Sequence, residues 1–302
     1  MKDDCFLSVV MVSDFEPTDT KSWKDELALV HALAQQDVQE QFEVLLIESE
    51  ESRDQEVPSS LYEMIPGLSV HYFDSVKSAD LKDYGVRLAR GKYVAVLESD
   101  CVPTRDWLRA LLGAMSRNDW DIVSGRTFYG NESTYKRVMN LLHRSWFDHG
   151  RSCPTTYISN NGAIYRREVL QQFPYPNSAT PFVSAEIRNG KIQQAGYRSY
   201  YEREALMKHA IGGISFVWDL QRNKGHQSMT SAPHQAYSQI PRLLGAKVKS
   251  NIKNCGRLGS EYLRWYDWPA LIFFMFAELV PFSVGMVEAV NKVEVLSGSA
   301  YR

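Results

Sequence analysis

Two carboxylates lie one residue apart at the end of an expected buried strand in the first half of the chain. The segment Tyr93–Leu97 is apolar and rich in residues that favour strands, and Glu98, Ser99 and Asp100 follow it directly. Like charges repel and desolvated carboxylates are unfavourable, so this placement requires either full solvation or a ligand that carries positive charge. The order of elements along the chain decides between these interpretations.

Short apolar segments alternate with segments of helical periodicity over the first 125 residues. The expected strands are 6–13, 42–49, 68–74, 93–97 and 121–130, and the expected helices are 22–36, 78–91 and 105–117. This alternation predicts parallel βαβ units and an α/β fold with a doubly wound, mostly parallel sheet flanked by helices. Ligands of such sheets bind at the carboxyl ends of the strands.

Acidic side chains follow several of these strands and therefore lie on the expected ligand edge. Asp14 follows the first strand together with Ser13, and Glu48 lies at the end of the second. Carboxylate oxygens at such an edge suit a hard divalent cation, Mn²⁺ or Mg²⁺, and also accept hydrogen bonds from sugar hydroxyls. The chain lacks both G-x-G-x-x-G and G-x-x-x-x-G-K-[ST], so a metal held by acids is the natural way to neutralise a diphosphate.

Composition narrows the class of protein. The chain has 302 residues and a net charge of −2, so no global basicity argues for nucleic acid as a partner. The four cysteines lie far apart without a C-x-x-C pair, which argues against a zinc ribbon or a disulfide scaffold and fits a reducing compartment. The first strand is expected almost at once, so we expect no secretory leader and a cytoplasmic location.

The order of elements over residues 6–225 resembles the family-2 glycosyltransferases of the GT-A fold. The segment DYGVRLARGKYVAVLESDCVP is similar to the family segment that ends in a D-x-D motif, with Glu98 as the first acid and Asp100 as the second. SNNGAIYRREVL (159–170) resembles the acceptor-side segment, where a small-residue turn precedes an Arg-Arg helix start. AEIRNGKIQQAGYRSYYEREALMKH (185–209) resembles the segment with the catalytic acid, an A-G-Y turn and a final His.

The resemblance implies a role for each matching residue. Asp100 would coordinate a divalent cation that bridges the two phosphates of a nucleotide-sugar, and His209 would add a metal or diphosphate contact. The implied donor-binding residues are Ser13, Asp14, Glu48, Lys82, Glu98, Ser99 and Arg222, and the implied acceptor-binding residues are Asn160 and Asn161. Of the donor-binding residues, Glu48 would bind the base and Glu98 the ribose or the metal. Segment 216–226 resembles a flexible family segment that closes over the diphosphate.

The catalytic base departs from the family pattern. Inverting transfer needs a carboxylate that takes the proton of the acceptor hydroxyl. The family commonly has Glu-Asp in this segment, but a gapless count back from the A-G-Y turn places Ser184 and Ala185 there. We therefore expect Glu186 to be the base, with a shift of one residue. The departure leaves open a nucleotide-sugar-binding protein without transferase activity.

The C-terminal region combines a basic segment with an apolar one. Residues 242–264 carry six basic residues against one acid, and residues 268–287 are apolar apart from Glu278, with Pro281 near the middle. A basic segment before an apolar one suits an anionic cytosolic leaflet, on which the apolar helix would span, lie or re-enter. The alternative is a buried helix that packs on the catalytic domain.

The expected domain organisation follows from these segments. Residues 1–230 would form the GT-A catalytic domain, with 1–125 as its nucleotide-sugar-binding half and 126–230 as its acceptor and catalytic half. Residues 231–302 would form a helical, membrane-associating tail.

Together these features predict a metal-dependent, inverting glycosyltransferase on the cytosolic face of a membrane. It would move a hexose or related sugar from a nucleotide-sugar to a lipid-linked or polysaccharide acceptor. A nucleotidyltransferase is a further alternative, since it also uses a carboxylate pair with metal. That class usually shows a glycine-rich, basic signature after the first strand, and VSDFEPTDTKSW (12–23) has none.

Overall fold

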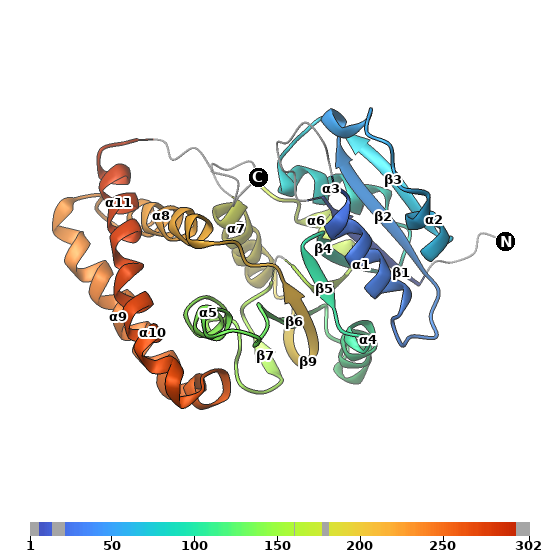
Figure 1. Cartoon of the computed structure of the whole chain (residues 1–302). Coiled ribbons are helices and arrows are strands. Elements are labelled where there is room, and N and C mark those ends of the chain that lie inside the picture. The colour runs from blue at the N-terminus through green and yellow to red at the C-terminus, as the bar shows by residue number, and fades with distance from the viewer. Residues whose placement is uncertain (1–5, 14–21, 160, 177–180, 294–302) are drawn as a thin grey trace. The chain divides into compact units, whose positions relative to one another are not determined.

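A computed structural model of the chain describes residues 6–13, 22–159, 161–176 and 181–293 (Figure 1), with the backbone alone for 181–183. Contacts divide the chain into two compact units. Among the described residues, the α/β unit comprises those up to 128 together with 151–209, and the helical unit comprises 129–150 together with 210–293. The C-terminal part of the helical unit begins at residue 210, and the predicted tail begins at residue 231. The predicted domains are defined by function, and their boundaries stay a prediction.

The α/β unit is built on one mixed sheet. In the described part of the chain its strands are β1 (Leu7–Val12), β2 (Phe42–Ser49), β3 (Leu68–Phe73), β4 (Tyr93–Glu98), β5 (Cys101–Pro103), β6 (Ile122–Phe128), β7 (Cys153–Thr155), β8 (Ala163–Arg166) and β9 (Ser199–His209). Their order is β3–β2–β1–β4–β8–β6–β9–β5, and β7 pairs with β9. The first four strands are mutually parallel, as predicted, whereas β8 is antiparallel to both β4 and β6.

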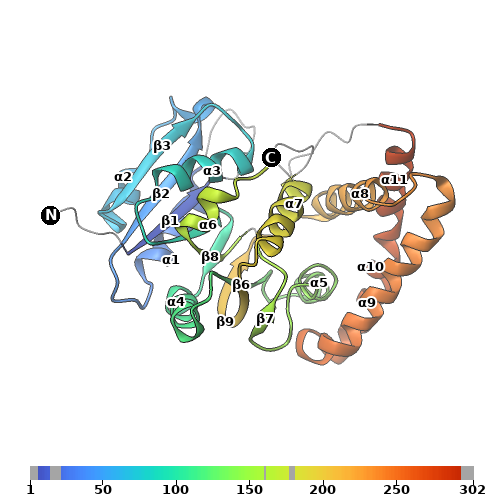
Figure 2. The same cartoon turned by 180° about the vertical axis from the view of Figure 1, so that it is seen from behind.

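Helices cover both faces of this sheet (Figures 1 and 2). They are α1 (Lys24–Ala34), α2 (Ser59–Met64), α3 (Ser78–Leu88), α4 (Trp107–Asn118), α6 (Arg167–Gln172) and α7 (Pro181–Gln194). Alternate side chains of β1 reach opposite faces: Val9 packs in the cluster with α1, α2 and α4, and Val10 packs in the cluster with α3 and α6. Strands buried on both faces read as continuous apolar runs, so the α/β fold class was predictable and is confirmed.

The helical unit contains the remaining helices. They are α5 (Thr134–Met139), α8 (Ile214–Thr230), α9 (Ile240–Tyr262), α10 (Trp268–Ala277) and α11 (Leu279–Val290), with a π-helical turn at Asn140–Arg144 and short 3₁₀ turns at Tyr237–Gln239 and Trp265–Asp267. The segment 216–226, expected to be flexible, lies within α8. It is helical because α8 packs along α11, with Val217 and Met229 among its buried residues.

Two glycines bring α8 and α11 into backbone contact. A Cβ at Gly225 would overlap the carbonyl oxygen of Phe282, and a Cβ at Gly285 would overlap the carbonyl oxygen of Arg222. Phe282, Met286 and Met229 are buried beside this crossing. The crossing therefore tolerates no side chain at either glycine.

Candidate active site

The carboxyl ends of neighbouring parallel strands bring Ser13, Glu48 and Glu98 to one edge of the sheet. β1 lies between β2 and β4, and its last residue, Val12, is in register with Glu98. The N–H of Ser99 donates to the carbonyl of Val12 at 2.9 Å, which fixes the start of the turn after β4. The structure thus gathers at this edge the side chains that the strand order placed there.

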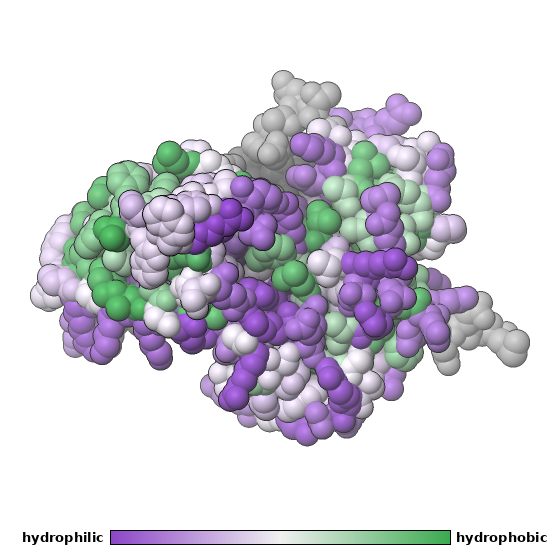
Figure 3. Space-filling view, turned by 60° about the horizontal axis from the view of Figure 1, so that its bottom comes forward, coloured by the Kyte–Doolittle hydropathy of each residue, from purple (hydrophilic) through white to green (hydrophobic). Residues whose placement is uncertain are grey.

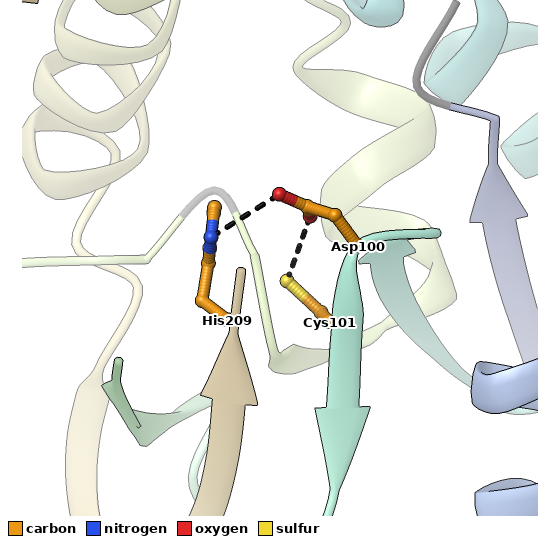
Figure 4. Close-up of side chains that lie close together, drawn as sticks. All are labelled: Asp100, Cys101 and His209. Carbon is orange, nitrogen blue, oxygen red and sulfur yellow. Dashed lines mark hydrogen bonds and ion pairs between the residues drawn. The ribbon is translucent and has the colours of Figure 1, made fainter. Parts of the chain in front are cut away.

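Asp100, Cys101 and His209 form a cluster at this edge (Figure 4). Asp100 lies in the turn between β4 and β5, and Cys101 is directly opposite His209 in the antiparallel pair of β5 and β9. The Nδ1 atom of His209 lies 3.2 Å from Oδ2 of Asp100, and the thiol of Cys101 donates to Oδ1 of the same carboxylate at 3.3 Å. The side chains of Asp100 and His209 are 15% and 13% exposed, so the carboxylate and the imidazole meet at a partly solvated site.

The donor set of this cluster fits a divalent cation. One carboxylate oxygen, one imidazole nitrogen and one sulfur lie within 4.8 Å of one another. Aspartate and histidine are common ligands of divalent metals, and three protein donors leave positions for oxygens of a substrate. Asp100 and His209 are the two residues that the sequence assigned to the metal, and the fold brings them together.

Glu98 is held from several sides. Lys82 of α3 places Nζ 2.5 Å from Oε1 of Glu98, and Ser78 donates to the same oxygen at 3.3 Å. The Nδ2 of Asn161 donates to Oε2, while the backbone N–H of Glu98 donates to Oδ1 of Asn161 at 2.7 Å. Gly162 follows with φ of +72°, the left-handed conformation that glycine adopts without strain. Lys82 and Asn161 therefore orient Glu98 in this structure.

Glu98 and Lys82 each stabilise the charged form of the other. Burial alone would raise the pKa of Glu98, but the ammonium of Lys82, together with the hydrogen bonds and His209, holds that pKa below its usual value. Burial alone would lower the pKa of Lys82, and the Glu98 carboxylate keeps it above its usual value. Both groups are thus charged at neutral pH, and the charge of Lys82 compensates that of Glu98, two residues before Asp100.

A second group of polar side chains lies around the ends of β1 and β2. Ser13 donates to Glu26 of α1 at 2.5 Å, and both residues are buried. Glu48 is 1% exposed and lies opposite Tyr72 of β3, whose ring is covered by the guanidinium of Arg53 at 4.7 Å. Burial, and next the carboxylate of Glu48, raise the pKa of Tyr72. Glu26 and Tyr72 were not predicted for this edge; Tyr72 lies there because β2 pairs with β3.

The candidate base, Glu186, is an exposed residue of α7. Ser184 and Ala185, which occupy the family's Glu-Asp positions in a gapless count, are both buried, and Ser184 donates to the carbonyl of Pro176 at 2.6 Å. Arg188, on the same helix, is buried and donates to the hydroxyl of Tyr165 at 3.0 Å. Within this stretch of α7, Glu186 is the carboxylate that reaches solvent.

Three assigned residues are not described as part of this edge. Asp14 and Asn160 are outside the described residues. Arg222 belongs to the helical unit, where its guanidinium pairs with Glu288 of α11 at 2.8 and 2.6 Å. Its donor-binding role stays a prediction.

The sequence of the sheet edge decides the family. Residues 24–173, which include α3, β4 and the turn with Glu98 and Asp100, match the sequence model of glycosyl transferase family 2. The chain belongs to this family. It is therefore a glycosyltransferase that uses a nucleotide-sugar, as the resemblance implied. No curated protein matches the sequence significantly.

Solved structures support the GT-A fold of this family-2 enzyme. The mannosyltransferase PcManGT from Pyrobaculum calidifontis, in complex with GDP-Man and Mn²⁺, is 13% identical with a TM-score of 0.58, over 94% of this chain and 87% of that one. S. aureus TarS 1-349 in complex with UDP is 15% identical with a TM-score of 0.51, over 95% and 83%. GalNAc-T7 with UDP, GalNAc and Mn²⁺ is 14% identical with a TM-score of 0.52, over 69% and 44%. At these identities the likeness concerns the fold.

Proposed function

We propose that this family-2 enzyme is an inverting, divalent-cation-dependent glycosyltransferase that moves a hexose or related sugar to a lipid-linked or polysaccharide acceptor. The observation that carries the metal-dependent part is the 3.2 Å contact between Asp100 and His209, beside the oriented carboxylate of Glu98. Three structures of similar fold were solved with a nucleotide or a nucleotide-sugar, two of them with Mn²⁺.

Asp100 and His209 would hold the cation, which supplies positive charge to the diphosphate leaving group. Glu98, fixed by Lys82 and Asn161, presents a carboxylate of constant orientation toward the donor. Because Lys82 neutralises Glu98, the edge keeps a moderate local charge and does not repel a nucleoside diphosphate. Ser13, Glu48 and Ser99, at the ends of β1, β2 and β4, would line the nucleotide part of the donor site.

Glu186 would act as the general base. Its carboxylate takes the proton of the acceptor hydroxyl, and the hydroxyl oxygen then attacks the anomeric carbon opposite the leaving diphosphate. Attack from that side inverts the anomeric configuration. Burial of Ser184 and Ala185 supports the choice of Glu186, since neither of those side chains reaches an acceptor in solvent.

The helical unit supports a membrane-bound acceptor. Among the described residues, one stretch, Trp265–Val290, is long and apolar enough to cross a membrane, and a third of its most apolar window is buried inside the protein. Large apolar side chains remain exposed along it, and Figure 3 shows hydrophobic surface gathered over these helices. They are Trp265, Trp268, Ile272, Phe273, Phe276, Val280, Val284 and Val287. An open groove of about 470 Å³ continues this surface along α11.

The mode of membrane binding follows from the inner side of these helices. Glu278, between α10 and α11, is buried and accepts from His143 at 2.6 Å, with Lys247 at 3.6 Å. One side of the segment is thus committed to polar and packing contacts inside the unit, and lipid is left to contact the other side. We therefore expect the segment to lie in the membrane surface. The exposed bases of α9, Lys249 and Lys253, would each add roughly 1 kcal/mol on an anionic leaflet, which argues for the cytosolic face.

The donor is tested with a panel of nucleotide-sugars. Thermal unfolding of the full chain is measured with each compound, with and without Mn²⁺. A midpoint raised by a nucleotide-sugar only when Mn²⁺ is present supports the proposal and identifies the base and the sugar. Equal stabilisation without the cation would remove metal dependence from the proposal. Analysis of the anomeric configuration of the product tests inversion.

Membrane binding is tested by sedimentation with vesicles of anionic and of neutral lipids. The full chain should sediment with anionic vesicles, and the double variant Phe273→Ser, Phe276→Ser should not, because it removes two of the exposed apolar side chains. Tyr62→Ser is the matched control, since Tyr62 is an exposed aromatic residue of the α/β unit. Equal sedimentation of the double variant and the control would contradict this surface as the contact.

A further inference from the structure

The proposed function assigns the cation to Asp100 and His209, and the thiol of Cys101 lies in the same cluster. Cys101 and His209 are directly opposed across the antiparallel pair of β5 and β9, which places both side chains on the same face of the sheet. Asp100 precedes Cys101 in the turn, and its carboxylate lies against both side chains (Figure 4). The register of two strands therefore brings an oxygen, a nitrogen and a sulfur donor together.

The three donors lie close enough together to reach one ion, since a carboxylate oxygen, an imidazole nitrogen and a sulfur all lie within 4.8 Å of one another. The sulfur of Cys101 lies 3.3 Å from one oxygen of Asp100, and Nδ1 of His209 lies 3.2 Å from the other. Donors that bind one tetrahedral ion at about 2.0–2.3 Å lie roughly 3.3–3.7 Å from each other. Because the two contacts use different oxygens of Asp100, the side chains must turn until one oxygen, the nitrogen and the sulfur face the same ion.

The chemistry of the third donor decides which ion. Carboxylate and imidazole bind many divalent cations, whereas thiolate favours Zn²⁺ and similar borderline-soft ions and is a poor ligand for Mg²⁺. A Cys, His and Asp set is a tetrahedral zinc set with one open position. A diphosphate oxygen would be a suitable fourth ligand.

We propose that Cys101 is a metal ligand, and that it makes this site bind Zn²⁺ or Co²⁺ in preference to Mg²⁺. The inference rests on the proposed metal site at Asp100 and His209 and adds its cation selectivity. Asp100 and His209 form the part of the site open to solvent, and the buried sulfur of Cys101 closes it from the side of the core. An ion entering from solvent would therefore meet the carboxylate and the imidazole first, and the thiolate would complete its coordination.

The test is a titration of the full chain with Co²⁺ in the absence of nucleotide. Thiolate bound to Co²⁺ gives a charge-transfer absorption in the near ultraviolet, and added Zn²⁺ should abolish it by displacement. Cys101→Ser should lose this band and weaken Zn²⁺ binding by at least about tenfold, the lower end of the effect of removing a supporting partner of a metal ligand. Cys153→Ser and Cys255→Ser, which change half-buried thiols outside the cluster, should keep the band.

The outcomes separate this inference from the proposed function. A wild-type chain that binds Mn²⁺ but gives no thiolate band with Co²⁺ would overturn the role of Cys101 and leave the Asp100 and His209 site intact. A chain that binds none of these cations, even with a nucleoside diphosphate present, would overturn the metal site as a whole. Because the band is read on the wild type, the test holds even if Cys101→Ser fails to fold. Unchanged Zn²⁺ affinity in a folded Cys101→Ser or Cys101→Ala variant would also refute the inference.

Discussion

Substitution of Gly225 by alanine is expected to destabilise the helical unit, although alanine is the better helix former. In an unconstrained helix, Gly→Ala contributes up to about 1 kcal/mol of stability. At Gly225, however, the new Cβ would overlap the backbone carbonyl of Phe282 in α11, and a backbone atom cannot move aside by changing rotamer. The two helices must then separate, which loosens the packing of Phe282, Met286 and Met229.

The two effects oppose each other, and the overlap is larger. Overpacking a tight contact typically costs about 1–3 kcal/mol, and a clash with backbone belongs at the upper end of that range. Subtracting the helix-propensity gain leaves a net loss of about 2 kcal/mol in the free energy of unfolding. Gly285→Ala should lose a similar amount, because its Cβ would overlap the carbonyl of Arg222.

The assay is urea unfolding followed by far-ultraviolet circular dichroism, with a matched control on a neighbouring helix. Gly256 of α9 is exposed, and nothing lies within 4 Å of a Cβ built there, so Gly256→Ala should be neutral or stabilising. If Gly225→Ala proves as stable as Gly256→Ala, the close crossing of α8 and α11 is wrong. The inference that the backbones of α8 and α11 are in direct contact would then be refuted.

Two further predictions concern the α/β unit. Glu186→Gln should keep donor binding and reduce transfer by roughly 10²–10⁴-fold, since it removes the proposed general base. The control is Glu168→Gln, which changes another exposed acid. Turnover within a few-fold of wild type in Glu186→Gln would place the base elsewhere. Burial raises the pKa of Asp83 to about 6. The unfolded chain therefore releases this proton at lower pH than the folded one. As the pH rises from about 4 to about 6, the free energy of unfolding consequently decreases. Asp83→Asn should raise the free energy of unfolding by about 1–2 kcal/mol at pH 7, a value reduced for partial solvent exposure, and should leave it unchanged below pH 4. A difference between variant and wild type in urea unfolding that does not depend on pH would contradict this.

Much of the fold could be predicted because it depends on local patterns. The parallel strands are buried on both faces, so β1, β2 and β4 appear as predominantly apolar segments between amphipathic helices. The acids at their ends share one edge because these strands are parallel. The mixed second half of the sheet was not predictable in this way, since the antiparallel strand β8 is short and its pairing depends on distant partners.

Side-chain partnerships across the fold were beyond the reach of sequence patterns. The contact of Asp100 with His209 was implied by the family resemblance, but the place of Cys101 beside them depends on the register of β5 and β9. The side chain of Asn161 donates to Glu98, a contact that the sequence did not indicate, and its acceptor-binding role stays a prediction. Such contacts join residues far apart in the chain and leave no periodic signal.

The central claim is that the Asp100 edge binds a nucleoside diphosphate through a divalent cation. The most direct measurement is a calorimetric titration of the full chain with UDP and with GDP, with and without Mn²⁺. Asp100→Asn is compared with Asp106→Asn, which changes an exposed acid paired with Arg109 outside the cluster. We predict that wild type and Asp106→Asn bind one of the nucleotides only with Mn²⁺, and that Asp100→Asn loses this binding while unfolding like wild type. Cation-dependent binding of equal affinity in Asp100→Asn would contradict the account.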